Sequence, residues 1–210
     1  LNLYLQSLDR LGQADPRLGA DNATPLLLPP VPADAPDLTI AELLSPLIQR
    51  ASATATLQSR PWNGPSQWPE WTQTPRAAPD AVVAEIVANL LENAFRYSPP
   101  GCELGLTLLD HDICIWDAGP AIPAEEREHI FAKGERGSSS TDRPGSGLGL
   151  ALARQLADNL GGSLTLQTAP KTLHASLPAV GNAFVLRLPR SSQATTCLLY
   201  TSPSPRDLAV

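Results

Sequence analysis

Residues that build metal centres and disulfide frameworks are scarce in this chain. Its 210 residues include three Cys, three His and no Met. Two of the cysteines, Cys102 and Cys114, fall on neighbouring predicted strands, and no C-x-x-C or clustered Cys/His spacing accompanies them. This pattern excludes a zinc motif and favours two buried thiols in a reducing compartment.

Positive charge and long apolar runs are also in short supply. Lys and Arg number 15 against 21 Asp and Glu, a net charge of -6. That balance argues against a nucleic-acid-binding protein, which needs a basic surface. No apolar run approaches the roughly 18 residues that span a bilayer. With 42% hydrophobic residues, the chain still has enough apolar side chains for the core of one ordinary domain.

The two ends of the chain are expected to lie outside that domain. Residues 1–12 place leucines at helical spacing, typical of the end of a helix, and residues 13–37 form a linker rich in Pro, Ala and Asp. Residues 197–207, CLLYTSPSPRD, resemble position by position the translation of a transposase-type sequencing adaptor. We therefore interpret 191–210 as a non-native tail. Because the chain begins at Leu1 and lacks Met, we interpret it as a fragment.

Between these ends, hydrophobic periodicity predicts a mixture of helices and strands. Helices are expected over 39–50, 80–97 and 124–131, and from the glycine run that follows 142 to residue 160. Strands are expected near 54–58 and 68–72, as a hairpin of 102–109 and 112–116, and at 163–168 and 183–189, with a loose loop before the last. The predicted fold class is α/β: a two-layer sandwich with helices on one face of a mostly antiparallel mixed sheet.

A glycine run stands directly before the last predicted helix, in the segment DRPGSGLGLALAR. Gly145, Gly147 and Gly149 leave the backbone bare where that helix begins, and unpaired amides at the positive end of a helix dipole favour a phosphate. The segment lacks the Lys-Ser or Lys-Thr of a Walker loop, and Leu150 stands where the dinucleotide fingerprint has its third glycine. We therefore predict a phosphate-binding turn of another kind.

One face of the helix that contains NLLENAFRYS is polar. Asn89, Glu92, Asn93 and Arg96 follow helical spacing opposite an apolar stripe. Asn costs roughly 0.5 kcal/mol relative to Ala inside a helix, so two of them one turn apart call for a reason. Amide oxygens suit Mg²⁺, which shares its ligand shell with substrate phosphates, and Arg96 and Tyr97 can meet those phosphates. The alternative is a solvated polar face without a ligand.

A carboxylate ends the second strand of the predicted hairpin, in the segment CIWDAGPAIP. Asp117 is followed by Gly119, and a carboxylate beside flexible backbone can accept a hydrogen bond from the amino group of adenine. The alternative is an Asx-type turn, in which Asp117 bonds only to neighbouring amides.

Taken in order, these segments resemble the ATP-binding catalytic domain of sensor histidine kinases, a branch of the superfamily that includes gyrase-type topoisomerases and MutL repair proteins. NLLENAFRYSPPG resembles the N box, DAGPAIP the first glycine box, HIFAKGERG the phenylalanine box and RPGSGLGLALAR the second glycine box. The resemblance implies a Bergerat-type fold over residues 38–190, preceded by a short helical remnant.

The resemblance also implies roles for individual residues. Asn93 would ligate Mg²⁺ with Asn89 assisting, and Glu92 would be the remaining candidate base. Asp117 would read adenine. The implied ATP contacts are Asn89, Asn93, Arg96, Tyr97, Asp117, Gly119, Ile122, the lid cations Lys133, Arg136 and Arg143, and Gly145, Gly147, Leu148, Gly149 and Leu150.

The sequence departs from the family pattern in three places, one of which is a segment, 171–181, that is longer than usual between the last two strands. Ala121 replaces the second glycine of the first glycine box, and Gly134 stands where the phenylalanine box has a second aromatic residue. An alternative is therefore a degenerate nucleotide-binding or docking module of the same fold. Asn89 stands where ATP-hydrolysing relatives place a Glu base, which favours a kinase over a hydrolase.

The resemblance further implies partners. His111, His129 and His174 lack the setting of a phosphoacceptor and are interpreted as surface histidines, so the acceptor helix is expected upstream. Residues 1–12 are interpreted as the end of a dimerisation helix. The resemblance implies that the full-length protein is a homodimer and that this part is the cytoplasmic domain of a bacterial inner-membrane protein. The implied partners are ATP and a response-regulator receiver domain. A Ser/Thr kinase of anti-sigma type is the third alternative, disfavoured by that preceding helix.

Overall fold

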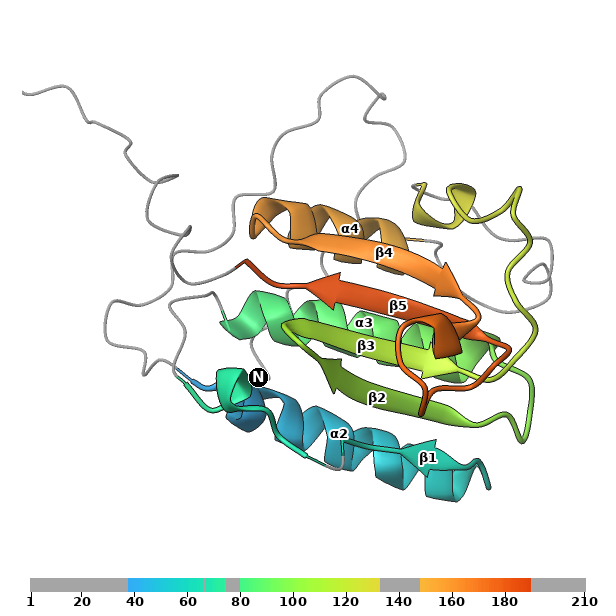
Figure 1. Ribbon diagram of the computed structural model, residues 1–210, viewed down its shortest axis with the longest axis horizontal. Coiled ribbons are helices and arrows are strands. Elements are labelled where there is room, and N and C mark those ends of the chain that lie inside the picture. Colours follow the sequence, from blue (N-terminus) through green and yellow to red (C-terminus); the bar gives the residue numbers. More distant parts are fainter. Residues whose placement is uncertain (1–37, 66, 75–79, 133–147, 190–210) are drawn as a thin grey trace, which may run out of the picture. The chain divides into compact units, whose positions relative to one another are not determined.

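The computed structural model describes residues 38–65, 67–74, 80–132 and 148–189 (Figure 1). Over these residues the helices are α2 (Ile40–Leu57), α3 (Asp80–Tyr97) and α4 (Gly149–Asn159), with short 3-10 helices η1 (Glu70–Thr72), η2 (His129–Phe131) and η4 (Pro170–Thr172). The strands are β1 (Trp62–Asn63), β2 (Leu104–Leu109), β3 (Asp112–Asp117), β4 (Ser163–Thr168) and β5 (Asn182–Arg187). The expectations for residues 1–37 and 190–210 lie outside the described residues.

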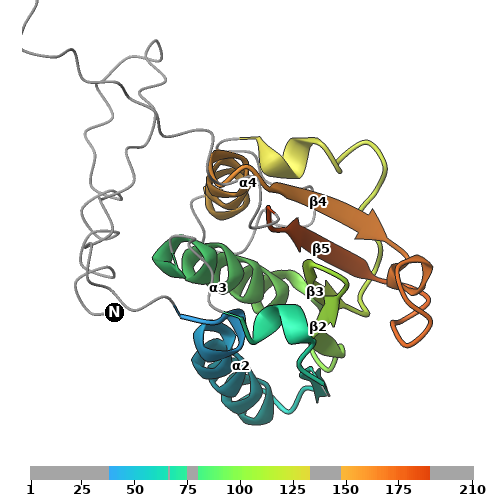
Figure 2. The ribbon, with the colours of Figure 1, turned by 60° about the vertical axis from the view of Figure 1, so that its left-hand side comes forward.

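The strands form one mixed sheet in the order β1-β2-β3-β5-β4. β1 pairs parallel to β2, and every other pair is antiparallel. Helices α2, α3 and α4 cover one face of the sheet (Figure 2). The predicted two-layer α/β sandwich is therefore confirmed. In the central pairing Asp117, the last residue of β3, lies opposite Asn182, the first of β5.

The main core lies between the sheet and the helices. The apolar stripe of α3 is completely buried at Val83, Ile86, Val87 and Leu90. Each such side chain contributes roughly 1.5–3 kcal/mol relative to an exposed position. This burial, rather than helix propensity alone, fixes α3 on the sheet and directs its other side away from the core.

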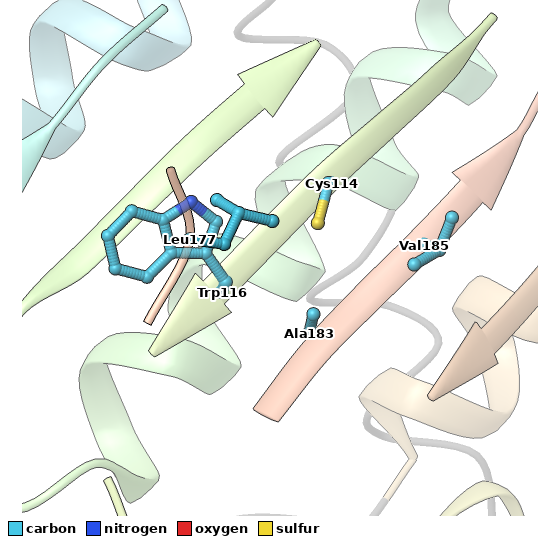
Figure 3. Packing of buried hydrophobic residues seen from close by; sticks show 5 residues of the cluster. All are labelled: Cys114, Trp116, Leu177, Ala183 and Val185. Atoms are coloured by element: carbon cyan, nitrogen blue, oxygen red, sulfur yellow. The ribbon is translucent and has the colours of Figure 1, made fainter. Parts of the chain in front are cut away.

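The opposite face of the sheet carries a second, smaller core (Figure 3). Cys114 and Trp116 of β3 lie beside Ala183 and Val185 of β5, and Leu177 covers them. Leu177 comes from the segment between β4 and β5, for which the sequence indicated only a loose loop. Lys171 and Pro178 close that segment on itself, with the amide of Lys171 donating to the carbonyl of Pro178 at 2.9 Å. The segment therefore serves as a cover for the back of the sheet.

Trp116 is the largest side chain of this back-face core. Its indole Nε1 donates to Thr107 Oγ1 at 3.0 Å, and its ring lies on Gly105. A Cβ at Gly105 would be 2.4 Å from that ring, so glycine is needed there for the close approach.

Helix α2 is longer than predicted. It begins with a capping box, in which Thr39 Oγ1 accepts the Glu42 amide at 3.1 Å and Glu42 Oε2 accepts the Thr39 amide at 2.9 Å. Buried Ala51 and Ala55 extend its apolar stripe beyond residue 50, and the helix continues to Leu57, which is exposed. The strand predicted at 54–58 is therefore wrong.

Several smaller expectations also need correction. Residues 68–72 contain η1 rather than a strand, and only the last three residues of the helix predicted over 124–131 are helical, as η2. Cys102 is half-buried and precedes β2 instead of lying on it, whereas Cys114 is buried as predicted. Burial raises the pKa of the Cys114 thiol to about 12.

The remaining elements agree with the sequence. The helix 80–97, the hairpin and the strand 163–168 are confirmed, and α4 ends one residue before the predicted 160. Within the described part of the chain, no helix is long and apolar enough to cross a membrane.

Candidate functional site

Asp117 is a buried carboxylate at the end of the central strand. Only 7% of the residue is exposed, and its Oδ1 accepts the backbone amide of Gly119 at 2.8 Å. Burial raises the pKa of Asp117 above its ordinary value, while the Gly119 amide, the side chain of Asn182 and the charge of Arg60 oppose that rise. The Asx-type turn is thus present, but it occupies only one carboxylate oxygen, so the other can still meet a ligand.

Asn182 holds Asp117 from the neighbouring strand. Its Nδ2 donates to Asp117 Oδ1 at 3.2 Å and to the Pro120 carbonyl at 2.9 Å, and its Oδ1 accepts the amide of Ile122 at 2.8 Å. Sequence reasoning missed this residue. The only available signal was a polar residue, in GNAFVLRLP, directly before an apolar strand.

Arg60 is a second buried polar residue that the sequence did not indicate. It follows α2, is 8% exposed, and donates to the carbonyls of Phe95, Pro99 and Cys102 at 3.0, 2.8 and 3.4 Å. A cation at these carbonyls suits the negative end of the α3 dipole. Pro99 in turn borders Gly119, where a Cβ would come within 3.0 Å of its ring. Arg60 therefore fixes one wall beside Asp117.

The polar side of α3 faces the beginning of α4 at Asn89. Its Nδ2 donates to the backbone oxygen and to Oε1 of Glu85, both at 3.0 Å. This pairing turns Oδ1 toward Gly149, where a Cβ would lie 3.4 Å from it. The structure thus brings together the predicted polar helix face and the end of the glycine run, two segments about sixty residues apart in the sequence.

The other predicted residues of α3 differ in their surroundings. Glu92 and Arg96 form an ion pair one turn apart, with 63% and 36% of their side chains exposed. Asn93 and Tyr97 are half-buried. Glu92 is therefore directed to solvent and engaged by a cation, which makes it poorly suited to act as a base.

Helix α4 begins in a way that suits an anion. Leu148 occupies the N-cap position and is 40% exposed, and an aliphatic side chain cannot cap the first amides. Gly149 and Leu150 open the helix, and its first turn carries no acidic residue. Lys133, Arg136, Arg143, Gly145 and Gly147, the other predicted phosphate-binding residues, lie outside the described residues.

The donor set can accommodate a hard divalent cation that shares its ligands with a phosphate. Within the described ranges, no group of three or more His, Cys, Asp or Glu residues could hold a metal ion by itself. Asn89 and Asn93 instead offer amide oxygens one turn apart, and Mg²⁺ typically takes only one or two protein ligands beside water and substrate phosphates.

The three histidines are not gathered at this site. His129 and His174 are exposed, as predicted, whereas His111 is half-buried and packs on Trp71 with ring centroids 5.6 Å apart. His111 lies in the turn between β2 and β3, at the opposite end of β3 from Asp117.

Comparisons with known proteins agree with the fold. Residues 80–192 match the family model described as histidine kinase-, DNA gyrase B-, and HSP90-like ATPase. Sensor histidine kinase Hik2 of Thermosynechococcus vestitus is 36% identical over 168 residues, which cover 76% of this chain and 40% of Hik2. The chain thus spans about two fifths of that relative.

Solved structures show the same architecture. Mycobacterial sensor histidine kinase MprB is 27% identical with a TM-score of 0.57, and the match covers 72% of this chain and 96% of that structure. The catalytic domain of histidine kinase ThkA has the same TM-score at 19% identity, over 72% of this chain and 93% of that one, and supports the fold alone.

Proposed function

The chain belongs to the family of histidine kinase-, DNA gyrase B- and HSP90-like ATPases, and from this premise we propose that it is the ATP-binding catalytic domain of a sensor histidine kinase. Hik2 and MprB carry the name of sensor histidine kinases, which supports this branch of the family over the others. The observation that carries the proposal is the approach of Asn89 Oδ1 to Gly149, because it places a ligand suited to Mg²⁺ beside amides suited to phosphate.

The base of the nucleotide lies at Asp117. Its carboxylate accepts a hydrogen bond from the amino group of adenine. Gly119 and Ile122 line the pocket for the adenine ring. Ala121, the departure from the family pattern, is exposed in the structure, so its methyl group does not fill the space beside Asp117. This exposure weakens the case for a degenerate module.

The phosphates lie between α3 and α4. The first amides of α4 at Gly149 and Leu150 bind them together with Leu148, Gly145 and Gly147, and Lys133, Arg136 and Arg143 neutralise charge on the γ-phosphate. Asn93, assisted by Asn89, holds Mg²⁺, which supplies further charge neutralisation when bound. Arg96 and Tyr97 contact phosphate or ribose, for which Arg96 leaves its exposed ion pair with Glu92.

The reaction is a phosphoryl transfer in which these residues contribute positioning and electrostatics. The bond from the γ-phosphorus to the oxygen shared with ADP breaks, and a bond to an imidazole nitrogen of a histidine on another helix forms. The phosphoryl group then passes to an aspartate of a response-regulator receiver domain. The whole protein is a homodimer through its dimerisation helices, and this domain is its cytoplasmic part.

Direct titration tests the nucleotide site. The full chain is titrated calorimetrically with the non-hydrolysable analogue AMP-PNP, in Mg²⁺ and in EDTA. We expect saturable binding that Mg²⁺ strengthens. Asn93→Ala is expected to lose the Mg²⁺ effect, and Asp117→Ala to lose binding in both buffers.

The matched control is Gln73→Ala. Gln73 also donates its side-chain amide to an oxygen, the Trp68 carbonyl at 2.9 Å, but it follows η1, whose Trp71 packs on His111 at the opposite end of β3 from Asp117. It should bind like the wild type. A wild type that is folded by circular dichroism and does not bind AMP-PNP at millimolar concentration would contradict the proposed function.

A further inference from the structure

Asn182 uses both ends of its side-chain amide on the residues that surround the base. We propose that Asn182 is a specificity-determining residue that fixes the Asp117 carboxylate so that a single oxygen faces the base, which selects adenine over guanine. This inference rests on the proposed function and assigns a role to a residue outside the motifs described above.

The two oxygens of Asp117 are unequally occupied. Oδ1 accepts the amide of Gly119 at 2.8 Å and Nδ2 of Asn182 at 3.2 Å, whereas Oδ2 has only a long contact of 3.4 Å with the same Nδ2. A carboxylate oxygen with two donors has little capacity left. Oδ2 is therefore the oxygen that can accept a further hydrogen bond.

The position of Asn182 is itself rigid. It is 5% exposed, and it ties the segment after β3 to β5 through the Pro120 carbonyl and the Ile122 amide. The preceding Gly181 has a φ of +141° and lies so close that a Cβ would be 1.9 Å from the Asp117 carbonyl oxygen. Asp117 and Asn182 are thus held as direct cross-strand partners, and the carboxylate cannot rotate without breaking several bonds.

A fixed carboxylate distinguishes the two purines by their donors. Adenine presents one exocyclic amino group beside the acceptor N1. Guanine presents N1–H and an amino group side by side, and a carboxylate pairs with them best through both oxygens. Because Asn182 and Gly119 occupy Oδ1, Asp117 suits the single donor of adenine and not the double donor of guanine.

The other groups that face Asp117 leave this arrangement in place. Arg60 lowers the pKa of Asp117 through its charge, and its own donors are engaged by three carbonyls. Among the residues that the structure describes, Cys102 is a second titratable group coupled to Asp117. Burial and the charge of Asp117 raise the pKa of its thiol, which keeps it neutral near pH 7.

Two variants of Asn182 test the role in the full chain. Asn182→Ala removes all the bonds, and Asn182→Asp keeps the size and the acceptor for Ile122 but replaces the donor by a second carboxylate. Binding of AMP-PNP and of the guanine analogue GMP-PNP is measured by calorimetry with Mg²⁺ between pH 5 and 8. Gln73→Ala is the control.

For Asn182→Ala we expect about a tenfold loss of AMP-PNP affinity, the loss of one net hydrogen bond to a charged group, and a preference for adenine reduced by a similar factor. For Asn182→Asp we expect a reversed pH profile. Wild-type affinity falls as the pH drops through the pKa of Asp117, whereas a pair of carboxylates that takes up one shared proton regains its bridging donor as the pH drops.

The outcomes separate the two proposals. If the wild type prefers AMP-PNP and both variants, folded by circular dichroism, keep its purine preference and its pH profile, the role of Asn182 is overturned while the proposed function stands. If the wild type binds neither nucleotide, the proposed function fails and this inference with it. A change in the melting temperature alone, with the purine preference unchanged, also overturns the inference.

Discussion

The two ends of the candidate site are built in opposite ways. At the base end, Asp117, Asn182 and Arg60 are each less than a tenth exposed and are held by bonds from several elements. At the phosphate end, Glu92 and Leu148 are exposed and Arg96 is half-buried, and the groups proposed to bind the phosphates are backbone amides at the start of a helix. The base end is thus fixed by folding itself, and the phosphate end is left open to a ligand.

This contrast predicts the largest loss of stability for Arg60. Arg60→Met keeps the apolar stem and leaves the carbonyls of Phe95, Pro99 and Cys102 without their donor, so we expect the free energy of unfolding to fall by about 3 kcal/mol. Urea unfolding followed by circular dichroism measures it. The control is Arg154→Met. Arg60 lies over the ring of Phe95 and Arg154 over the ring of Phe131, but Arg154 is paired at the surface with Glu128. Its loss should stay below about 1 kcal/mol, and equal losses would contradict the comparison.

A smaller loss is expected at the cover over the back of the sheet. Leu177→Ala removes the side chain that covers Trp116 and Cys114, at a cost of about 2 kcal/mol, the low end for a buried Leu because the segment can settle inward. Leu173→Ala, on the same segment but 37% exposed, should change stability much less. Thermal unfolding of both variants measures the two losses. A lower melting temperature for Leu173→Ala than for Leu177→Ala would contradict this prediction.

Because the carboxylate of Asp117 is buried, we expect Asp117→Asn to gain stability in a pH-dependent way. Since burial raises its pKa in the folded state, the folded protein holds this proton more tightly than the unfolded one. Stability is therefore lost as the pH rises from the ordinary Asp pKa to the raised value. We expect Asp117→Asn to be more stable than the wild type above that window and to gain nothing below it. Urea midpoints at pH 3 and pH 8 measure the difference, and a gain of equal size at both would argue against it.

The smallest effect is expected at the phosphate end. Glu92→Gln removes the exposed pair with Arg96, which is worth at most about 0.5 kcal/mol, and less at high salt. Arg96 then no longer has to leave this carboxylate to reach a phosphate, so we expect AMP-PNP affinity to rise slightly rather than fall. A loss of nucleotide affinity in calorimetry would mean that Glu92 takes part in binding.

The local hydrophobic pattern was enough to predict the elements in which the apolar residues of the sequence are also the buried ones. The stripe of α3 and the alternation of β4 gave their bounds, because periodicity and burial coincide there. In the second half of α2, the local sequence pattern and the observed burial disagreed. A strand was predicted near 54–58, but the hydroxyls of Thr54 and Thr56 donate to the carbonyls of Arg50 and Ser52 at 2.9 Å, which satisfies them within the helix.

Long-range polar bonds were beyond such reasoning. Arg60 reaches carbonyls 35 to 42 residues away, and Asn182 reaches groups 60 to 65 residues away. The sequence around Arg60 and Asn182 contains no pattern that indicates their hydrogen-bond partners, so only the folded structure identifies these partners. Asp117 and Asn89 were accessible to sequence reasoning because each belongs to a recognisable motif. Their predicted roles toward ATP remain predictions that titration tests.

The back-face position of Trp116 gives the protein an optical signal of its own. The indole is 3% exposed, bonded to Thr107 and adjacent in the chain to Asp117. An indole in such dry surroundings emits at shorter wavelength than one in water, and any shift of β3 or of the Leu177 segment alters that emission. Events at the base end can therefore be followed by intrinsic fluorescence without a label, once the signals of Trp62, Trp68 and Trp71 are removed by substitution to Phe.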